Sequence, residues 1–306
     1  MEYGSSAHNM LLVRDESLLT LTERDPTGRF LLDEFVGLVD NNPSWDDDER
    51  TLIYEAIELM YEAHGVQDRG NGDAYITHPL RVAIDLCMQN ASARLVAAGL
   101  LHDAPEDRAQ AVSEYLMHER TSADQAVSLA AIHHKAPSSP TRSDYIELSL
   151  ALLREHQTFS PAAVLVDEVT NRAYPPEIDA LIQSDVLTAA KHAYRADQIK
   201  RHARAGSDEA LLKFFDTYDN IRSLTRHEAL HTEPLSLPRL EKLVEKYSLM
   251  IDTWLSLAAE LPPDISLDRL VLCQERLRSL SHTIAQRKRL RAIAERAITG
   301  VEQSVA

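Results

Sequence analysis

The sequence contains only two cysteines among its 306 residues, Cys87 and Cys273, and both lie in apolar patterns of helical spacing. Two isolated thiols provide neither a disulfide framework nor a cysteine-based zinc site, so we expect both to be packing residues. Long hydrophobic runs are also absent. Nothing approaches the roughly 20 apolar residues of a membrane span, and the N-terminus lacks the basic region and apolar core of a signal peptide. These absences predict a cytoplasmic protein without membrane attachment.

Positive charge is scarce as well. The 32 Lys and Arg residues face 48 Asp and Glu residues, which gives a formal net charge of −16. Broad nucleic-acid binding needs a concentrated Lys and Arg surface, so no direct binding to nucleic acid is expected. A small phosphorylated ligand is still compatible with this charge, because a metal ion and a few local cations can reverse the field inside one cleft.

Alternating patterns typical of strands are absent, and apolar residues recur instead at helical spacing. The sequence therefore predicts an all-α fold with a compact helical core. The predicted helices cover residues 29–40, 47–65, 79–90, 92–103, 108–134, 143–156, 176–205, 207–231, 236–260 and 266–299.

Three regions are predicted along the chain. Residues 1–28 show no sustained period and contain glycine, proline and serine, which favours a tail or a loosely docked arm. Residues 29–265 are predicted to form the main helical domain. Residues 266–306 are predicted to add an amphipathic helix with a basic face, which packs on the domain through its leucines and isoleucines.

The most informative motifs are RGNGDAYITHPL and, after an apolar helix, LLHDAPED. They offer His78, His102 and Asp103 as metal ligands, because imidazole nitrogen and carboxylate oxygen together suit manganese, iron, zinc and similar ions. Glu106 and Asp107 follow one turn later, where a carboxylate can orient water. Any single histidine among the 13 is more often a surface or core residue, but the ordered set carries more weight.

These motifs resemble the metal-dependent HD-domain hydrolases of the RelA/SpoT type, whose pattern is an Arg-rich loop, Tyr-x-x-His-Pro and His-Asp-x-x-Glu-Asp. The likeness continues in VLVDEVTN (164–171) and in KFFDTYDNIRSL (213–224), which is similar to the family's Lys-Leu-x-Asp-Arg-x-x-Asn-x-Arg-Thr-Leu helix. The latter supplies a fourth ligand, Asp216. The resemblance implies a compact HD-domain helical fold. Since the chain ends soon afterwards, the synthetase and regulatory regions of long family members have no room, and we expect a stand-alone small alarmone hydrolase.

The resemblance also implies how the substrate is bound. Arg69 is expected to stack on the purine, Asn220 to lie near the sugar or phosphates, and Ser223 to stand where the family commonly has Thr. From helical periodicity alone, the polar stripe that contains Asp216, Asn220 and Ser223 is more commonly a solvated surface. Only the resemblance makes it the wall of a binding pocket.

The chain departs from the family pattern at the expected nucleotide site. Gly70 and Asn71 replace a commonly basic and small polar pair, and Thr217 and Asp219 stand where the family helix usually carries Arg and His. The preference for guanine or adenine alarmones therefore stays open.

The largest departure is an insertion near residues 108–160, which we expect to be helical. Its segment HHKAPSSPTRSD (133–144) has the composition of an exposed loop and carries cationic donors. These donors are His133, His134, Lys135 and Arg142. An inert surface loop is the commoner outcome for such a segment, and a lid that contacts phosphate is the alternative. Because the insertion starts directly after Asp107, we hypothesise that it borders the pocket and affects substrate choice.

The activity implied by the resemblance is metal-dependent 3′-pyrophosphohydrolysis of (p)ppGpp, or of a related alarmone such as ppApp, to the nucleoside di- or triphosphate and pyrophosphate. The four ligands, expected to hold one Mn²⁺ ion, are His78, His102, Asp103 and Asp216. Glu106 and Asp107 are expected to position or deprotonate the attacking water.

Two alternatives stay open: a general HD-domain nucleotide phosphohydrolase, and a catalytically inactive HD protein that binds nucleotide or a partner. Small hydrolases of this type can act as antidotes to toxic alarmone synthetases, so functional pairing with such a synthetase is one biological context implied by the resemblance. The sequence leaves the oligomeric state open.

Overall fold

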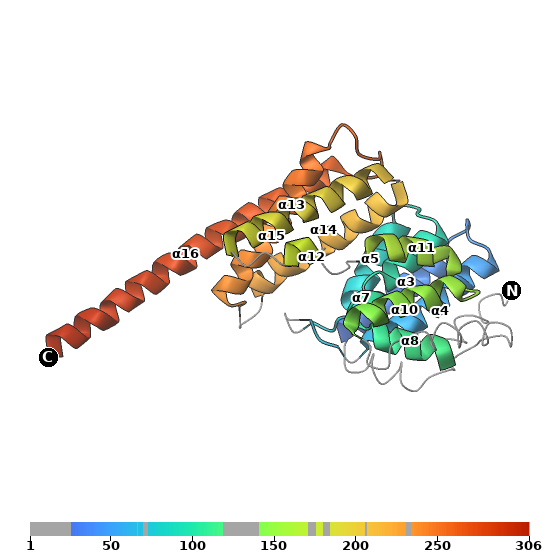
Figure 1. Cartoon of the computed structure of the whole chain (residues 1–306), viewed down its shortest axis with the longest axis horizontal. Helices are drawn as coiled ribbons and strands as arrows, with labels where there is room; N and C mark the ends of the chain where they lie inside the picture. Colours follow the sequence, from blue (N-terminus) through green and yellow to red (C-terminus); the bar gives the residue numbers. More distant parts are fainter. Residues whose placement is uncertain are drawn as a thin grey trace. The chain divides into compact units, whose positions relative to one another are not determined.

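Helices make up nearly all of the chain that the structure, a computed structural model, describes (Figure 1). The described residues are 26–65, 67–69, 73–118, 141–170, 176–179, 184–205, 207–230 and 234–305. Within them no strand forms, and β pairing is confined to an isolated bridge between Asp68 and Ala74. The all-α prediction is confirmed. Of the predicted arm, residues 1–25 lie outside the described part, and the first described helix begins at Pro26.

The chain divides into two compact units. The first consists of Met1–Pro175 and Gly206–Asp216, and the second of Pro176–Ala205 and Thr217–Ala306. Helix α14 (Ser207–Leu230) contributes to both units. This division into two units does not test the domain limits expected from the sequence, which stay predictions.

The first unit is built around an apolar helix, α6. Besides the first part of α14, its described helices are α3 (Pro26–Asp40), α4 (Asp47–His64), α5 (Thr77–Cys87), α6 (Ala93–Leu101), α7 (Ala104–Asp107), α8 (Ala109–His118), α10 (Arg142–Glu155) and α11 (Ser160–Val169). Helix α6 packs against α4, α5 and α11, and nearly all of its residues are buried. A Cβ on Gly99 would lie 2.7 Å from Leu86 Cδ1, so glycine permits the close approach of α6 to α5.

Two helices of this unit begin with a capping box. Asp46 Oδ1 accepts a hydrogen bond from the Glu49 amide at 2.9 Å, and the Glu49 carboxylate accepts one from the Asp46 amide at 3.1 Å. The same reciprocal bonds join Thr141 and Asp144 at the start of α10. Each box satisfies amides that the first helical turn would otherwise leave without partners, and so fixes where the helix begins.

The predicted insertion is helical where the structure describes it. Within residues 108–160 it forms α8 and α10, which pack against each other. Residues 119–140, which include His133, His134 and Lys135, lie outside the described residues.

The second unit contains α12 (Pro176–Asp179), α13 (Ser184–Ala205), the remainder of α14, α15 (Leu237–Ser256) and α16 (Leu267–Val305). Helix α15 packs against α13 and α16. The helix predicted over 266–299 is present as α16, and one apolar face of it is buried as far as Ile284. The buried side chains are Leu270, Cys273, Leu277, Leu280 and Ile284, whereas Leu267, Val271 and Leu272 are exposed. Beyond that point Leu290 is 64% exposed and Ile293 52% exposed, because the helix continues past the other helices of its unit (Figure 1).

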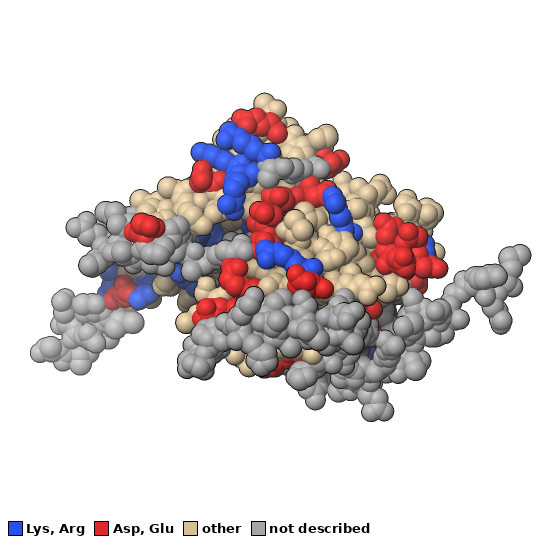
Figure 2. All heavy atoms as spheres, turned by 45° about the vertical axis from the view of Figure 1, so that its right-hand side comes forward, with Lys and Arg blue, Asp and Glu red and all other residues tan. Residues whose placement is uncertain are grey.

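Charged groups of both signs are mixed on the surface. On the face that Figure 2 draws, Lys and Arg side chains are scattered among clusters of Asp and Glu. This distribution agrees with the acidic net charge of the sequence. In the part of the chain that the structure describes, no helix has the length and apolar character needed to cross a membrane.

The packing of α3 gives a direct test of the first unit. Phe35 is fully buried on α3, which packs against α5, whereas Phe30 on the same helix is 67% exposed. We expect Phe35→Ala to lower the free energy of unfolding by about 3–5 kcal/mol, because it leaves a cavity. The matched Phe30→Ala should change it by about 0.5 kcal/mol or less. Urea unfolding measures both, and equal effects would contradict this packing.

Candidate metal centre

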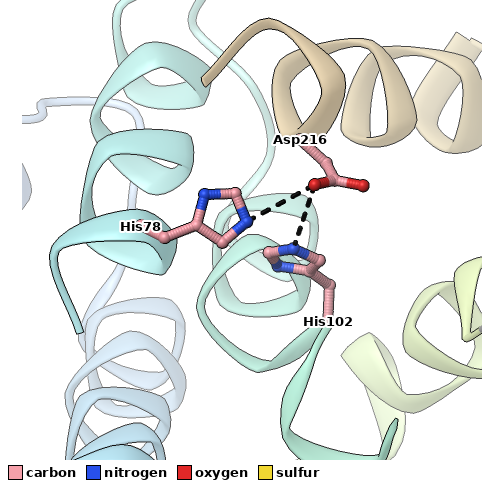
Figure 3. A group of neighbouring side chains, drawn as sticks. All are labelled: His78, His102 and Asp216. Atoms are coloured by element: carbon pink, nitrogen blue, oxygen red, sulfur yellow. Dashed lines mark ion pairs between the residues drawn. The ribbon is translucent and has the colours of Figure 1, made fainter. Parts of the chain in front are cut away.

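Three of the four predicted metal ligands converge at one place in the first unit (Figure 3). His78 lies in the first turn of α5, His102 directly follows α6, and Asp216 lies on α14. Their ligand atoms all lie within 4.8 Å of one another, and all three side chains are buried. The Asp216 Oδ1 atom is 3.4 Å from His78 Nε2 and 3.8 Å from His102 Nε2. Two nitrogens and one oxygen so arranged can hold a divalent metal ion.

Asp103, the fourth predicted ligand, lies beside this group. Its Oδ2 atom is 3.4 Å from His78 Nε2 and 3.3 Å from His102 Nε2. The same oxygen accepts a hydrogen bond from the Tyr75 hydroxyl at 2.8 Å. The structure therefore brings all four predicted ligands together, and ligation by Asp103 stays a prediction.

The environment of His102 suits a metal ligand. Its Nδ1 atom lies 2.8 Å from the Gly99 carbonyl oxygen, which favours a proton on Nδ1 and so reserves Nε2, once it is deprotonated, for a metal ion. The Nε2 atom is buried and makes no hydrogen bond to a described residue. An imidazole held by a backbone carbonyl in this way is typical of metal-binding histidines.

Lys213 positions the Asp216 carboxylate. It lies three residues earlier on α14, and its ammonium group donates a hydrogen bond to Asp216 Oδ2 at 2.9 Å. Both side chains are buried. One carboxylate oxygen is thus anchored by Lys213 while the other faces the imidazoles. Sequence reasoning did not assign Lys213 to the site, although its i,i+3 spacing from Asp216 was a usable signal.

Charge pairing determines the ionisation of these buried groups. Burial alone would raise the pKa of both carboxyl groups, but Lys213 and the two histidines hold the pKa of Asp216 well below its usual range. His102 and His78 likewise lower the pKa of Asp103. Burial would lower the pKa of His102, yet Asp103 and Asp216 outweigh it and raise that pKa well above its usual value. Both carboxylates are therefore ionised near neutral pH, as metal ligation requires.

These pKa shifts predict that metal binding releases a proton. Because the two carboxylates raise the pKa of His102, its imidazolium persists near neutral pH and must lose a proton before Nε2 can bind a cation. Metal affinity should therefore rise with pH up to the raised pKa of His102. Calorimetric titration of Mn²⁺ in buffers of different ionisation enthalpy measures the released protons. Proton-independent binding near neutral pH would contradict this account.

The role of Lys213 can be tested with a variant of matched length. Lys213→Met should weaken Mn²⁺ binding about 10–100-fold, because Asp216 loses the donor that orients it. Lys242→Met, which changes an exposed lysine on α15, serves as the control. Calorimetry measures the affinity, and circular dichroism checks that both variants are folded. Unchanged affinity in Lys213→Met would remove Lys213 from the site.

Tyr75 links the candidate ligands to the predicted water-activating residues. Its hydroxyl lies 2.8 Å from Asp103 Oδ2 and 2.6 Å from Asp107 Oδ2. Burial, together with these two carboxylates, raises the pKa of Tyr75 far above its usual value, so the hydroxyl stays protonated and can donate. The ring stacks on His64 with 4.4 Å between the centroids. The sequence analysis placed Tyr75 in the Tyr-x-x-His-Pro motif but predicted no role for its hydroxyl.

Glu106 and Asp107 both belong to the short helix α7. The charge of Glu106 contributes, after those of Asp216 and Asp103, to raising the pKa of the buried Lys213 ammonium. Glu106 is thus electrostatically coupled to the group that orients Asp216. The Asp107 carboxylate accepts a hydrogen bond from the Tyr75 hydroxyl. Their assignment to catalysis stays a prediction.

A residue of the predicted insertion also contacts the last two residues of α7, which we call the Glu106–Asp107 turn. Arg142, at the start of α10, donates to the Glu106 carbonyl oxygen from Nη2 at 2.9 Å and from Nε at 3.3 Å. Its Nη2 atom lies 3.7 Å from Asp107 Oδ1. Part of the insertion therefore lies directly against the Glu106–Asp107 turn.

The predicted substrate-binding residues fall in both units. The Arg69 guanidinium lies 5.9 Å from the centroid of the Tyr75 ring, within the first unit. Asn220 and Ser223 follow Asp216 on α14 but belong to the second unit. Ser223 donates a hydrogen bond to Asp219 at 3.4 Å. Contacts of these three residues with a nucleotide stay predictions.

Comparison with known proteins gives partial matches. No family model matches the chain. The guanosine-3′,5′-bis(diphosphate) 3′-pyrophosphohydrolase of Borreliella burgdorferi is 31% identical over 97 residues, which cover 30% of this chain and 14% of that protein. The protein of the same name from Aquifex aeolicus is 44% identical over 55 residues, 18% of this chain and 8% of its own length. The GTP pyrophosphokinase rsh of Brucella ovis is 38% identical over 61 residues, 20% of this chain and 8% of its own.

The chain is thus similar, over part of its length, to alarmone hydrolases and synthetases of the RelA/SpoT type. The matched segments span only a small share of each relative, at most 14% in these three. The similarity supports the resemblance seen in the motifs and leaves the activity of this chain to be proposed.

Proposed function

We propose that this chain is a metal-dependent alarmone 3′-pyrophosphohydrolase. The observation that carries the proposal is the convergence of His78, His102 and Asp216, with Asp103 beside them, in a chain similar to proteins named for this activity. The substrate is (p)ppGpp or a related alarmone such as ppApp. Water attacks the phosphorus next to the 3′-oxygen, that P–O bond breaks, and the products are the nucleoside di- or triphosphate and pyrophosphate.

The four candidate ligands would hold one divalent ion, which we propose to be Mn²⁺. Bound there, the ion would supply Lewis acidity, which promotes ionisation of water and withdraws charge from the phosphoryl oxygens. The residues fit such an ion because two ionised carboxylates and two imidazoles of suitable orientation face one another. Lys213 keeps the Asp216 carboxylate in its orientation through Oδ2.

Glu106 and Asp107 are the proposed proton acceptors for the attacking water. The Tyr75 hydroxyl lies within hydrogen-bond distance of both Asp107 and Asp103 and can donate its proton to either, so the proposed base and a proposed metal ligand share one partly buried support. This support fixes the position of Asp107 relative to the candidate metal centre. Orientation of this kind matters because proton transfer requires the base to lie within hydrogen-bond reach of the water.

Arg69, Asn220 and Ser223 are the proposed nucleotide contacts. Arg69 lies next to Tyr75 and can stack on a purine while it hydrogen-bonds. The choice between guanine and adenine is left to experiment, because the changes at Gly70, Asn71 and Thr217 alter the expected contacts without favouring one base. We further propose that the protein acts in the cytoplasm, and that pairing with a toxic alarmone synthetase is one context for it.

A general HD-domain nucleotide phosphohydrolase is the second candidate. It would share the histidine–aspartate cluster, whereas the segment 213–224 and the names of the similar proteins favour an alarmone. A binding protein without turnover is the third candidate. The complete set of four ligands argues against it.

The deciding experiment is hydrolysis of ppGpp, pppGpp and ppApp in parallel with added Mn²⁺, resolving pyrophosphate from orthophosphate. We expect pyrophosphate from at least one alarmone, and none from Asp103→Ala, which lacks a proposed ligand. Orthophosphate release would favour the general phosphohydrolase. Absence of turnover with all three substrates would favour the inactive binding protein.

The proposed bases have their own test. Glu106→Gln and Asp107→Asn should each lower kcat about 10²–10⁴-fold, because a general base contributes by that factor, while KM changes little. Glu114→Gln, at an exposed position on α8, is the matched control and should retain wild-type kcat. Wild-type kcat in either base variant would remove that residue from the mechanism.

A further inference from the structure

Arg142 places a guanidinium group at the Glu106–Asp107 turn. Its Nε and Nη2 atoms both donate to the Glu106 carbonyl oxygen, and its Nη2 atom lies 3.7 Å from the Asp107 carboxylate. The contacts continue from Asp107 through Tyr75 to Asp103, which faces the two histidines. All of these residues belong to the first unit. A cation is therefore fixed beside the proposed bases.

The guanidinium is held in place yet accessible. The capping box of Thr141 and Asp144 fixes the first turn of α10, and α10 packs against α7 and α8. The Arg142 side chain is nonetheless 69% exposed. Among the described residues no partner accepts a hydrogen bond from Nη1. Arginine has five N–H donors, so donors stay available for an anion while others hold the side chain to Glu106.

Two other cations among the described residues of this unit, Lys213 and Arg108, already have protein partners. Lys213 is buried and paired with Asp216, and Arg108 Nε donates to the Ala63 carbonyl oxygen. The loop after Arg69 continues with Gly70 and Asn71, neither of which carries a charge. A diphosphate near Glu106 and Asp107 would meet two carboxylates, so its binding needs a local positive group. Arg142 is such a group, and its planar fork matches phosphate oxygens.

We propose that Arg142, a residue of the inserted segment, binds the 3′-diphosphate of the substrate next to Glu106 and Asp107 and holds it as it leaves as pyrophosphate. This inference rests on the proposed function. It makes the insertion a part of the substrate-binding site, with Arg142 as the residue that recognises phosphate.

The alternative role for Arg142 is structural, as a tie between α10 and the Glu106–Asp107 turn. The two roles predict different kinetics. Loss of a phosphate contact raises KM and weakens binding of pyrophosphate. Loss of a tie displaces the proposed bases, so it lowers kcat or the melting temperature while KM and pyrophosphate affinity stay near their wild-type values.

The test uses the full chain with Mn²⁺ and three variants. Arg142→Met removes the charge, Arg142→Lys keeps a point charge without the fork, and Arg94→Met is the matched control. Arg94 is another exposed arginine of the first unit with an acidic partner, Asp208. The readouts are KM and kcat for the alarmone that the wild type hydrolyses, calorimetric titration with inorganic pyrophosphate, and the melting temperature.

We expect Arg142→Met to raise both KM and the Kd of pyrophosphate about 10–100-fold, the range for loss of a charge-assisted hydrogen bond. Arg142→Lys should lie between Arg142→Met and the wild type, and Arg94→Met should match the wild type. Wild-type KM and pyrophosphate affinity in Arg142→Met would overturn the inference, including the case in which only kcat falls.

The inference and the proposed function can fail separately. Hydrolysis by the wild type together with unchanged KM and pyrophosphate affinity in Arg142→Met overturns the role of Arg142 and leaves the proposed function standing. If the wild type hydrolyses no alarmone, the proposed function is overturned, and the substrate-binding role of Arg142 falls with it.

Discussion

The charge balance among buried groups at the candidate metal centre is the constraint on which the rest of the site depends. Asp216, which is buried, and Asp103, which is partly buried, stay ionised because His78, His102 and Lys213 offset the cost of removing their charges from water. Desolvation of unpaired charges would cost far more than helix packing returns. The positions of α5, α6 and α14 are therefore tied to one another through these side chains. A divalent cation would take over much of the positive charge that the imidazoles now supply.

The supporting contacts extend this balance outward from the ligands. Lys213 orients Asp216, Tyr75 joins Asp103 to Asp107, and Arg142 holds the turn that carries Asp107. Each contact uses a group from a different part of the chain, so the geometry of the site depends on the packing of the whole first unit. The segment that we predict to be an insertion contributes Arg142 to these contacts, which is why we propose for it a role in recognising the substrate.

The helices could be read from the sequence because their apolar residues recur at helical spacing. The helix predicted over 47–65 is α4 (Asp47–His64), and the one over 207–231 is α14 (Ser207–Leu230). His78 and His102 were predicted as ligands from the ordered motifs, and the structure brings their ligand atoms together. Asp216 was identified as a ligand only through the family resemblance, because helical periodicity alone predicts that its polar face is exposed to solvent. Tyr75 was missed because its role depends on the direction of its side chain toward partners on other segments, which one-dimensional spacing does not contain. Lys213 was missed although its partner Asp216 lies three residues later on the same helix.

We propose that His78, His102, Asp103 and Asp216 hold one divalent ion. Anomalous diffraction at the manganese edge, from crystals of the full chain grown with Mn²⁺, tests it most directly. We expect one anomalous peak at coordination distance from both histidine Nε2 atoms and from Asp216, with Asp103 as the fourth protein ligand. A manganese-loaded crystal with no peak at these residues, or with its only peaks elsewhere, would contradict the account.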